Sequence, residues 1–152
     1  MNGTDELSGP IYFDTNVIIA IVEGATPLSG GQSELLESID ARRVQAVTSE
    51  LTIAECLVKP FAERDANAVE MFLSFLDGRP SLPTIPIDRT LLLEAARLRA
   101  DTKLKLADAI HVATAVQARC SAFMTDDRRV KPIGEMGVVS WSSLGTGQDA
   151  SI

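Results

Sequence analysis

Carboxylate side chains stand where short apolar segments of the sequence end or where helical segments begin. Asp14 lies in IYFDTNVI, Glu55 in LTIAECL, Asp108 in LKLADAIHVATA, and Asp126 and Asp127 in AFMTDDRR. In an open α/β sheet, the loops after the carboxyl ends of the strands converge on one crevice. Carboxylates gathered there repel one another unless a divalent cation or protons compensate their charge. The spacing therefore predicts a metal site, and with it phosphate chemistry.

Each of these acids also has a purely structural explanation. An aspartate that opens a helix, as expected for Asp14 and Asp108, is a favourable N-cap. Thr52-x-x-Glu55 matches a capping box, in which the glutamate would only stabilise a helix start. With Ser49 as the cap instead, Glu55 falls inside the helix, where a partly buried carboxylate needs a partner. The sequence alone does not decide whether the helix starts at Ser49 or at Thr52.

Polar neighbours of the acids could support a metal site. Asn16 adds an amide in the same turn as the first acid, and the Thr125 hydroxyl could orient a carboxylate or a water. His111 is the only histidine of the chain and follows Asp108 by three residues. A single histidine is more often packed or hydrogen-bonded than a base, so we expect it to lie behind the acids and not among them.

Alternating strands and helices must position these side chains. Val and Ile runs predict strands, and apolar residues at helical spacing predict the helices between them. Strands are expected over 11–13, 44–48, 84–87, 122–125 and 138–141. The segment 84–87 should form an edge strand because it contains Pro86. Helices are expected over 17–22, 33–40, 49–59 with a stop at Pro60, 62–76, 88–101 and 107–118. This alternation favours a three-layer α/β domain with a mainly parallel sheet.

Length and composition limit the class of protein. A chain of 152 residues with 45% apolar and 23% charged residues is expected to form one domain with a substantial core. The net charge of −7 argues against a non-specific coat on nucleic acid, although bound cations would reverse the local sign at an acidic site. Cys56 and Cys120 form no metal-binding pattern and are expected to be reduced core thiols, which predicts a cytoplasmic protein.

The ends of the chain are interpreted as tails around this domain. We expect a flexible N-terminal tail over 1–10, the domain over 11–142, and a flexible C-terminal tail over 143–152. The first residues lack the basic segment followed by an apolar segment that is typical of a signal peptide. No apolar run approaches the length of a membrane span, so no membrane partner is expected.

Four segments together resemble a known family. IYFDTNVI, SELTIAE, LKLADAIHVATA and FMTDDRRV occur in the order seen in PIN-domain ribonucleases, particularly the VapC-type toxins of toxin–antitoxin pairs. The resemblance runs from about Ile11 to Trp141. It implies a Rossmann-like α/β/α fold and a metal-dependent endoribonuclease that hydrolyses phosphodiester bonds of single-stranded or structured RNA.

The resemblance also implies a set of site residues. Asp14, Glu55 and Asp108, with a fourth acid, would hold one or two Mg²⁺ or Mn²⁺ ions. The fourth acid would be Asp127, because the family pattern is Thr-x-Asp and Thr125 sets its register, with Asp126 as the alternative. Asn16 and Thr125 would be auxiliary residues, and Arg128 and Arg129 are candidates for contact with substrate phosphates.

Partners follow from the same resemblance. VapC-type proteins usually form homodimers and are inhibited by an antitoxin that covers the acidic site, often with an arginine. The predicted helix 62–76, with Met71, Phe72 and Phe75, is a candidate surface for either partner. These side chains could equally belong to the core.

Three alternatives remain. FDTNV resembles the first motif of haloacid-dehalogenase-type phosphatases, but Asn16 occupies the position of their general acid. A PIN-like binding module that has lost catalysis is the non-enzymatic alternative. A receiver-like phosphoacceptor domain would need a lysine beside the acids, and Lys131 is poorly placed for that role.

Overall fold

A single parallel sheet organises the computed structural model, which describes residues 9–145. The strand order is β3-β2-β1-β4-β5, and every neighbouring pair is parallel. The strands are β1 (Ile11–Phe13), β2 (Ala46–Ser49), β3 (Thr84–Ile85), β4 (Ala122–Met124) and β5 (Gly137–Val139). The prediction of a parallel α/β sheet is confirmed, and β3 is the edge strand that Pro86 led us to expect.

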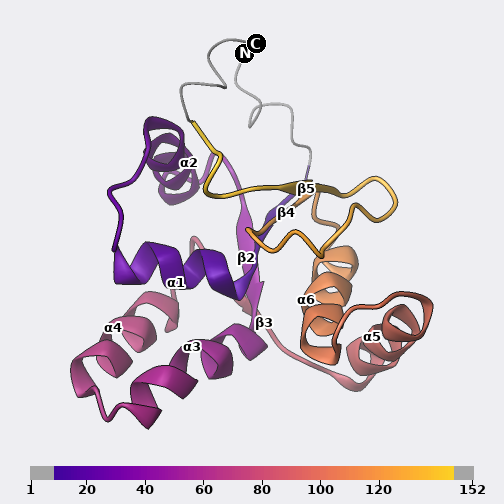
Figure 1. Cartoon of the computed structure of the whole chain (residues 1–152). Coiled ribbons are helices and arrows are strands. Elements are labelled where there is room, and N and C mark those ends of the chain that lie inside the picture. The colour runs from indigo at the N-terminus through magenta and orange to yellow at the C-terminus, as the bar shows by residue number, and fades with distance from the viewer. Residues whose placement is uncertain (1–8, 146–152) are drawn as a thin grey trace.

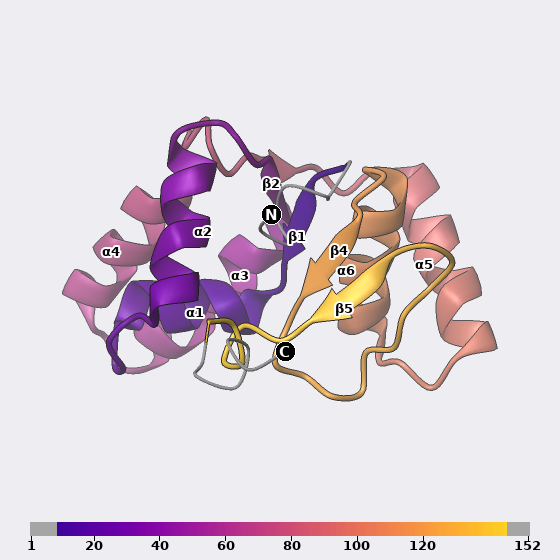
Figure 2. The ribbon, with the colours of Figure 1, turned by 90° about the horizontal axis from the view of Figure 1, so that it is seen from above.

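Helices cover both faces of the sheet, as Figures 1 and 2 show. Alternate residues of β1 explain this arrangement: Ile11 and Phe13 enter the core on one face, whereas Tyr12 enters the core on the other. The first face packs against α1 (Thr15–Glu23), α2 (Gly30–Asp40), α3 (Glu50–Ala62) and α4 (Ala66–Leu76), and the second against α5 (Arg89–Asp101) and α6 (Leu106–Gln117). The three-layer prediction is therefore confirmed.

The order of the connections places a crevice beside β1. The helices between β1, β2 and β3 lie on one face, and α5 and α6, which lead to β4, lie on the other (Figure 2). The chain therefore reverses its winding between β1 and β4, and such switch points form ligand crevices at the carboxyl ends of the strands. Asp14 directly follows β1, and Thr125 directly follows β4.

Some predicted helix boundaries were wrong. Pro60 does not stop α3, which continues to Ala62, because a proline removes only its own N–H from the ladder and here lies in the final turn. The next helix starts at Ala66 with Asp65 as its cap, four residues later than predicted. By contrast, α2 begins early because Ser29 and Gln32 form a capping box.

The α4 segment proposed as a surface divides between core and solvent. Phe72 is 3% exposed and belongs to the core, whereas Met71 is 51% exposed. Phe75 is partly buried against the same core. Only part of this helix is thus free for a partner.

Most of both predicted tails lies outside residues 9–145. Their described members contact the domain: the Pro10 carbonyl accepts the Ser121 N–H at 2.9 Å, and the Leu144 carbonyl accepts the Ser29 hydroxyl at 2.6 Å. Within the described part of the chain, no helix has the length and apolar character needed to cross a membrane.

Candidate active site

Asp14 occupies the centre of the site, at the end of β1. Its Oδ1 accepts the Thr15 N–H at 2.9 Å, so the side chain caps α1. Its Oδ2 accepts the Asn16 amide at 3.1 Å and the Thr125 hydroxyl at 2.8 Å. The residue as a whole is 5% exposed. Asp14 is therefore both a helix cap and the point where the loops after β1 and β4 meet.

Thr125 and Asn16 connect the two loops. The Thr125 hydroxyl accepts the Asn16 amide at 3.0 Å and the Asp127 N–H at 3.0 Å, in addition to donating to Asp14. The Asn16 carbonyl oxygen accepts the Asp126 N–H at 3.1 Å. These bonds fix the backbone of the loop after β4 relative to the first acid.

The two neighbouring aspartates of that loop point to different partners. The Asp126 carboxylate accepts the Ser140 hydroxyl and the Ser142 N–H, each at 2.9 Å, and so ties down the segment after β5. Asp127 instead forms an ion pair with Arg129, which also lies near Asp108. The structure thus brings Asp127, and not Asp126, towards the other acids.

Glu55 lies inside α3, because Ser49 is the cap and accepts the Leu51 N–H at 3.0 Å. Thr52 does not form the capping box that the sequence allowed. Its buried hydroxyl lies 2.7 Å from that of Thr48. The partner that a carboxylate at this position needs is the Thr15 hydroxyl, which donates to Glu55 Oε1 at 2.7 Å. Of the two helix starts that the sequence allowed, the structure has the one at Ser49.

A buried histidine, itself held by a tyrosine, contacts the same oxygen of Glu55. His111 Nε2 lies 2.5 Å from Glu55 Oε1 and 3.9 Å from Asp14 Oδ1, and its Nδ1 lies 2.6 Å from the Tyr12 hydroxyl. Burial, reinforced by the Asp14 charge, raises the pKa of Tyr12 well above its ordinary value. The phenol therefore stays protonated and donates to Nδ1, which leaves Nε2–H to donate to Glu55.

The pKa of Glu55 reflects these contacts. Burial alone would raise it, but hydrogen bonds from His111 and Thr15 outweigh burial and leave the pKa below its ordinary value. Glu55 is thus held as a carboxylate. His111 lies behind the acids, as the sequence led us to expect, and its ring holds one of them by a hydrogen bond.

Asp108 lies in the first turn of α6 and does not cap it. The cap position is Lys105, which forms no side-chain capping bond. Burial raises the pKa of Asp108; the Arg129 charge opposes this, and the charges of Asp127 and Asp14 raise the pKa further. The acids are therefore close enough to disfavour one another's ionised forms.

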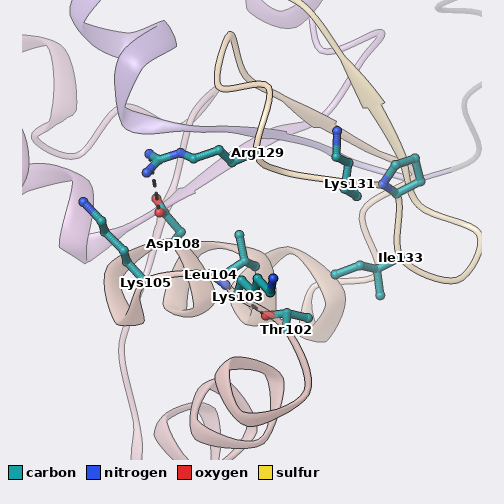
Figure 3. A pocket seen from close by; sticks show the side chains of 9 residues that line it. Thr102, Lys103, Leu104, Lys105, Asp108, Arg129, Lys131 and Ile133 are labelled. Carbon is teal, nitrogen blue, oxygen red and sulfur yellow. Dashed lines mark hydrogen bonds and ion pairs between the residues drawn. The ribbon is translucent and has the colours of Figure 1, made fainter.

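Arg129 compensates this repulsion. Its Nε donates to Asp127 Oδ1 at 3.0 Å, its Nη2 donates to Asp127 Oδ2 at 2.7 Å, and the same Nη2 lies 3.8 Å from Asp108 Oδ2. The hydrogen bonds from Arg129 lower the pKa of Asp127. Figure 3 shows the guanidinium above Asp108. Arg128, in contrast, is exposed and forms no ion pair with any described carboxylate.

Comparison with known families identifies the domain that carries this site. The sequence profile of the PIN domain family matches residues 11–135. The chain belongs to the PIN domain family. The resemblance inferred from the four segments is confirmed, and membership in this family speaks against the phosphatase and receiver alternatives. No protein with curated annotation matches the sequence.

Solved structures share the fold of this PIN domain. A toxin–antitoxin complex from Klebsiella pneumoniae is 26% identical, covering 83% of this chain and 94% of that one, with a TM-score of 0.58. FitAcB from Neisseria gonorrhoeae is 20% identical over 88% of this chain and 99% of that one, with a TM-score of 0.63. VapBC2 from Rickettsia felis, bound to a promoter DNA fragment, is 15% identical over 86% of this chain and 98% of that one, with a TM-score of 0.64.

The donor set of this PIN domain fits a hard divalent ion in its chemistry. The acids offer the carboxylate oxygens that Mg²⁺ and Mn²⁺ prefer, and the mutual repulsion at Asp108 is what a bound cation would relieve. As the side chains stand, no three His, Cys, Asp or Glu residues among those described surround a single point closely enough to hold an ion. Protein cations and donors fill that role instead, with Arg129 at one pair of acids and His111 at the other.

Sequence reasoning missed the role of Tyr12. It is the only tyrosine of the chain and lies in an apolar strand, as His111 lies in an apolar helix. A buried phenol or imidazole needs a hydrogen-bond partner. Two such groups, each the only one of its kind and each in a buried element, were a usable signal that they bind each other between the sheet and the helix.

Proposed function

We propose that this PIN domain is an endoribonuclease that depends on a divalent metal. The observation that supports this most strongly is the convergence of Asp14, Glu55, Asp108 and Asp127 at the switch point of the sheet. Helix capping explains only Asp14, since the other three cap no described helix. Carboxylates gathered at the carboxyl ends of parallel strands beyond what helix capping requires are typical of a catalytic metal site.

The four acids would hold one or two Mg²⁺ or Mn²⁺ ions. Such an ion lowers the pKa of a bound water and stabilises negative charge on phosphoryl oxygens. The residues of this chain then supply positioning: Asn16 and Thr125 orient Asp14, and the His111 contact orients Glu55. Arg129, beside the acids, and the exposed Arg128 next to it would contact a substrate phosphate.

A biological role as the toxin of a toxin–antitoxin pair is part of the proposal. The 26% identity with a chain of a toxin–antitoxin complex over 83% of the sequence supports it. The antitoxin would cover the acidic crevice, and the exposed part of α4 around Met71 would contribute to a homodimer or to antitoxin binding. Expression without a partner should then arrest growth of the host, and the Asp108→Asn variant should not.

Cleavage of RNA tests the activity. The purified protein is incubated with total RNA and Mg²⁺ or Mn²⁺, beside Asp108→Asn and a matched control, Asp101→Asn, at an exposed position of α5. We expect cleavage by the wild type and the control only, abolished by EDTA. Equal cleavage by the Asp108→Asn variant would refute the assignment of the acids. No cleavage, together with no Mn²⁺ binding by calorimetry, would favour a binding module without catalysis.

A further inference from the structure

A cavity adjoins the acidic site on the α6 side. It has a volume of about 370 Å³ and lies between the turn that joins α5 to α6 and the loop after β4. Asp108 and Arg129 belong to its lining, so the cavity borders the acidic site at Asp108 (Figure 3). Its volume is within the range of about 300–1,000 Å³ typical of ligand sites.

Lysines are concentrated around this cavity. The chain has four lysines, and Lys103, Lys105 and Lys131 all line it. All three are exposed, and none forms an ion pair with a carboxylate in the described part of the chain. In a protein of net charge −7, three unpaired cations at one cavity create a local positive field that attracts anions.

The same cavity has an apolar surface. Leu104 and Ile133 are half-buried and pack on the core that contains Tyr12 and Phe123. Their backbones are fixed: the Leu104 carbonyl accepts the Arg99 guanidinium at 3.0 Å, and Ile133 exchanges two backbone hydrogen bonds with Met136. A rigid apolar surface ringed by cations suits a ligand that carries both a flat apolar group and negative charge.

We infer that this cavity is a subsite for single-stranded RNA, which takes one unpaired base and its flanking phosphates. The base would lie on Leu104 and Ile133, and the phosphates would contact Lys103, Lys105 and Lys131. An unpaired strand exposes base faces beside regularly spaced phosphates, whereas a duplex hides the faces. An acidic peptide would satisfy the lysines but offers no flat group at each charged unit. The inference rests on the proposed ribonuclease function, since the cavity shares Asp108 and Arg129 with the acids.

Binding without cleavage tests the subsite. A fluorescent single-stranded RNA 12-mer is titrated with protein in EDTA, by anisotropy, over a series of salt concentrations. The variant Lys103→Gln/Lys105→Gln/Lys131→Gln is compared with Lys59→Gln, which changes the fourth lysine, exposed on α3. We expect the triple variant to bind at least tenfold more weakly. Its log–log salt slope should fall by roughly two, because each phosphate contact on a single strand contributes about 0.7. Lys59→Gln should change neither quantity.

A second variant separates the base from the phosphates. Ile133→Ser should weaken binding but leave the salt slope unchanged, since it removes an apolar contact and no charge. If the triple variant binds RNA with the affinity and the salt slope of the wild type, the proposed subsite is refuted. Equal binding of duplex RNA with the same lysine dependence would also overturn it. Lysine-dependent binding by a wild type that does not cut RNA with Mg²⁺ or Mn²⁺ would support the subsite and reject the ribonuclease proposal.

Discussion

The two halves of the acidic site stabilise their carboxylates by different means. In the buried half, Asp14 and Glu55 meet His111, whose side chain is 2% exposed and is held by Tyr12. In the outer half, Asp108 and Asp127 meet Arg129, whose side chain is 62% exposed. The inner partner is locked by packing, whereas the outer partner is a flexible side chain in solvent. The inner half should therefore determine geometry and stability, and the outer half should exchange its cation for a metal.

The largest effect is expected at the acid that both loops share. Asp14→Asn removes the negative charge but keeps a side chain that caps α1 well. We expect RNA cleavage to fall by about 10²–10³-fold, as for other losses of electrostatic stabilisation in an active site. The melting temperature should fall only modestly, because the amide oxygen keeps the cap while the amide nitrogen cannot accept the bonds of Asn16 and Thr125. A large drop in melting temperature would show that Asp14 acts mainly as a structural residue.

Removal of the inner partner should cost stability. His111→Ala removes one hydrogen-bond partner each from the Tyr12 hydroxyl and from Glu55 and opens a cavity in a packed helix face, at a cost of about 2–4 kcal/mol. Urea unfolding measures this loss. Arg129→Gln, the matching change in the outer half, should leave the urea midpoint nearly unchanged because exposed ion pairs contribute little. Equal losses of stability in the two variants would contradict the division of the site into a stabilising inner half and an outer half that contributes little stability.

The outer half should govern metal affinity. Arg129→Gln removes the cation that competes with a metal for Asp127 and Asp108, so Mn²⁺ should bind roughly two- to fivefold more tightly. Isothermal titration calorimetry measures the affinity. Arg128→Gln is the control, because it removes the same charge one residue away without breaking an ion pair. Weaker Mn²⁺ binding by Arg129→Gln than by this control would argue that Arg129 only supports the loop.

The smallest effect concerns the thiol beside Glu55. Burial raises the pKa of Cys56 to about 12, helped by the charge of Glu55, and burial alone raises that of Cys120 to about 12. Because the reactive form is the thiolate, both thiols of the native protein should react slowly with Ellman's reagent at pH 8 and quickly in urea. The Arg129→Gln variant should behave like the wild type, whereas His111→Ala should react faster if the inner half has loosened.

Much of the fold could be predicted from local sequence. Period-two and helical patterns located all five strands and all six helices of the described chain, with errors confined to boundaries such as Pro60. The four segments around the acids were sufficient to indicate the PIN domain family. The resemblance to the family pattern Thr-x-Asp favoured Asp127 over Asp126, and in the structure Asp127 shares Arg129 with Asp108. These features depend on residues within a few positions of each other, where propensity, capping and hydrophobic period act.

The pairing of the acids with their partners was decided only by the tertiary structure. Tyr12 and His111 are 99 positions apart, and Asp14 and Thr125 are 111 positions apart. Such contacts depend on the strand order and on which face of the sheet each helix covers, and no local window of sequence contains that information. The sequence by itself determined which side chains carry charge and where strands end. The winding of the chain around β1 determined that one pair of acids lies buried against His111 and the other faces solvent beside Arg129.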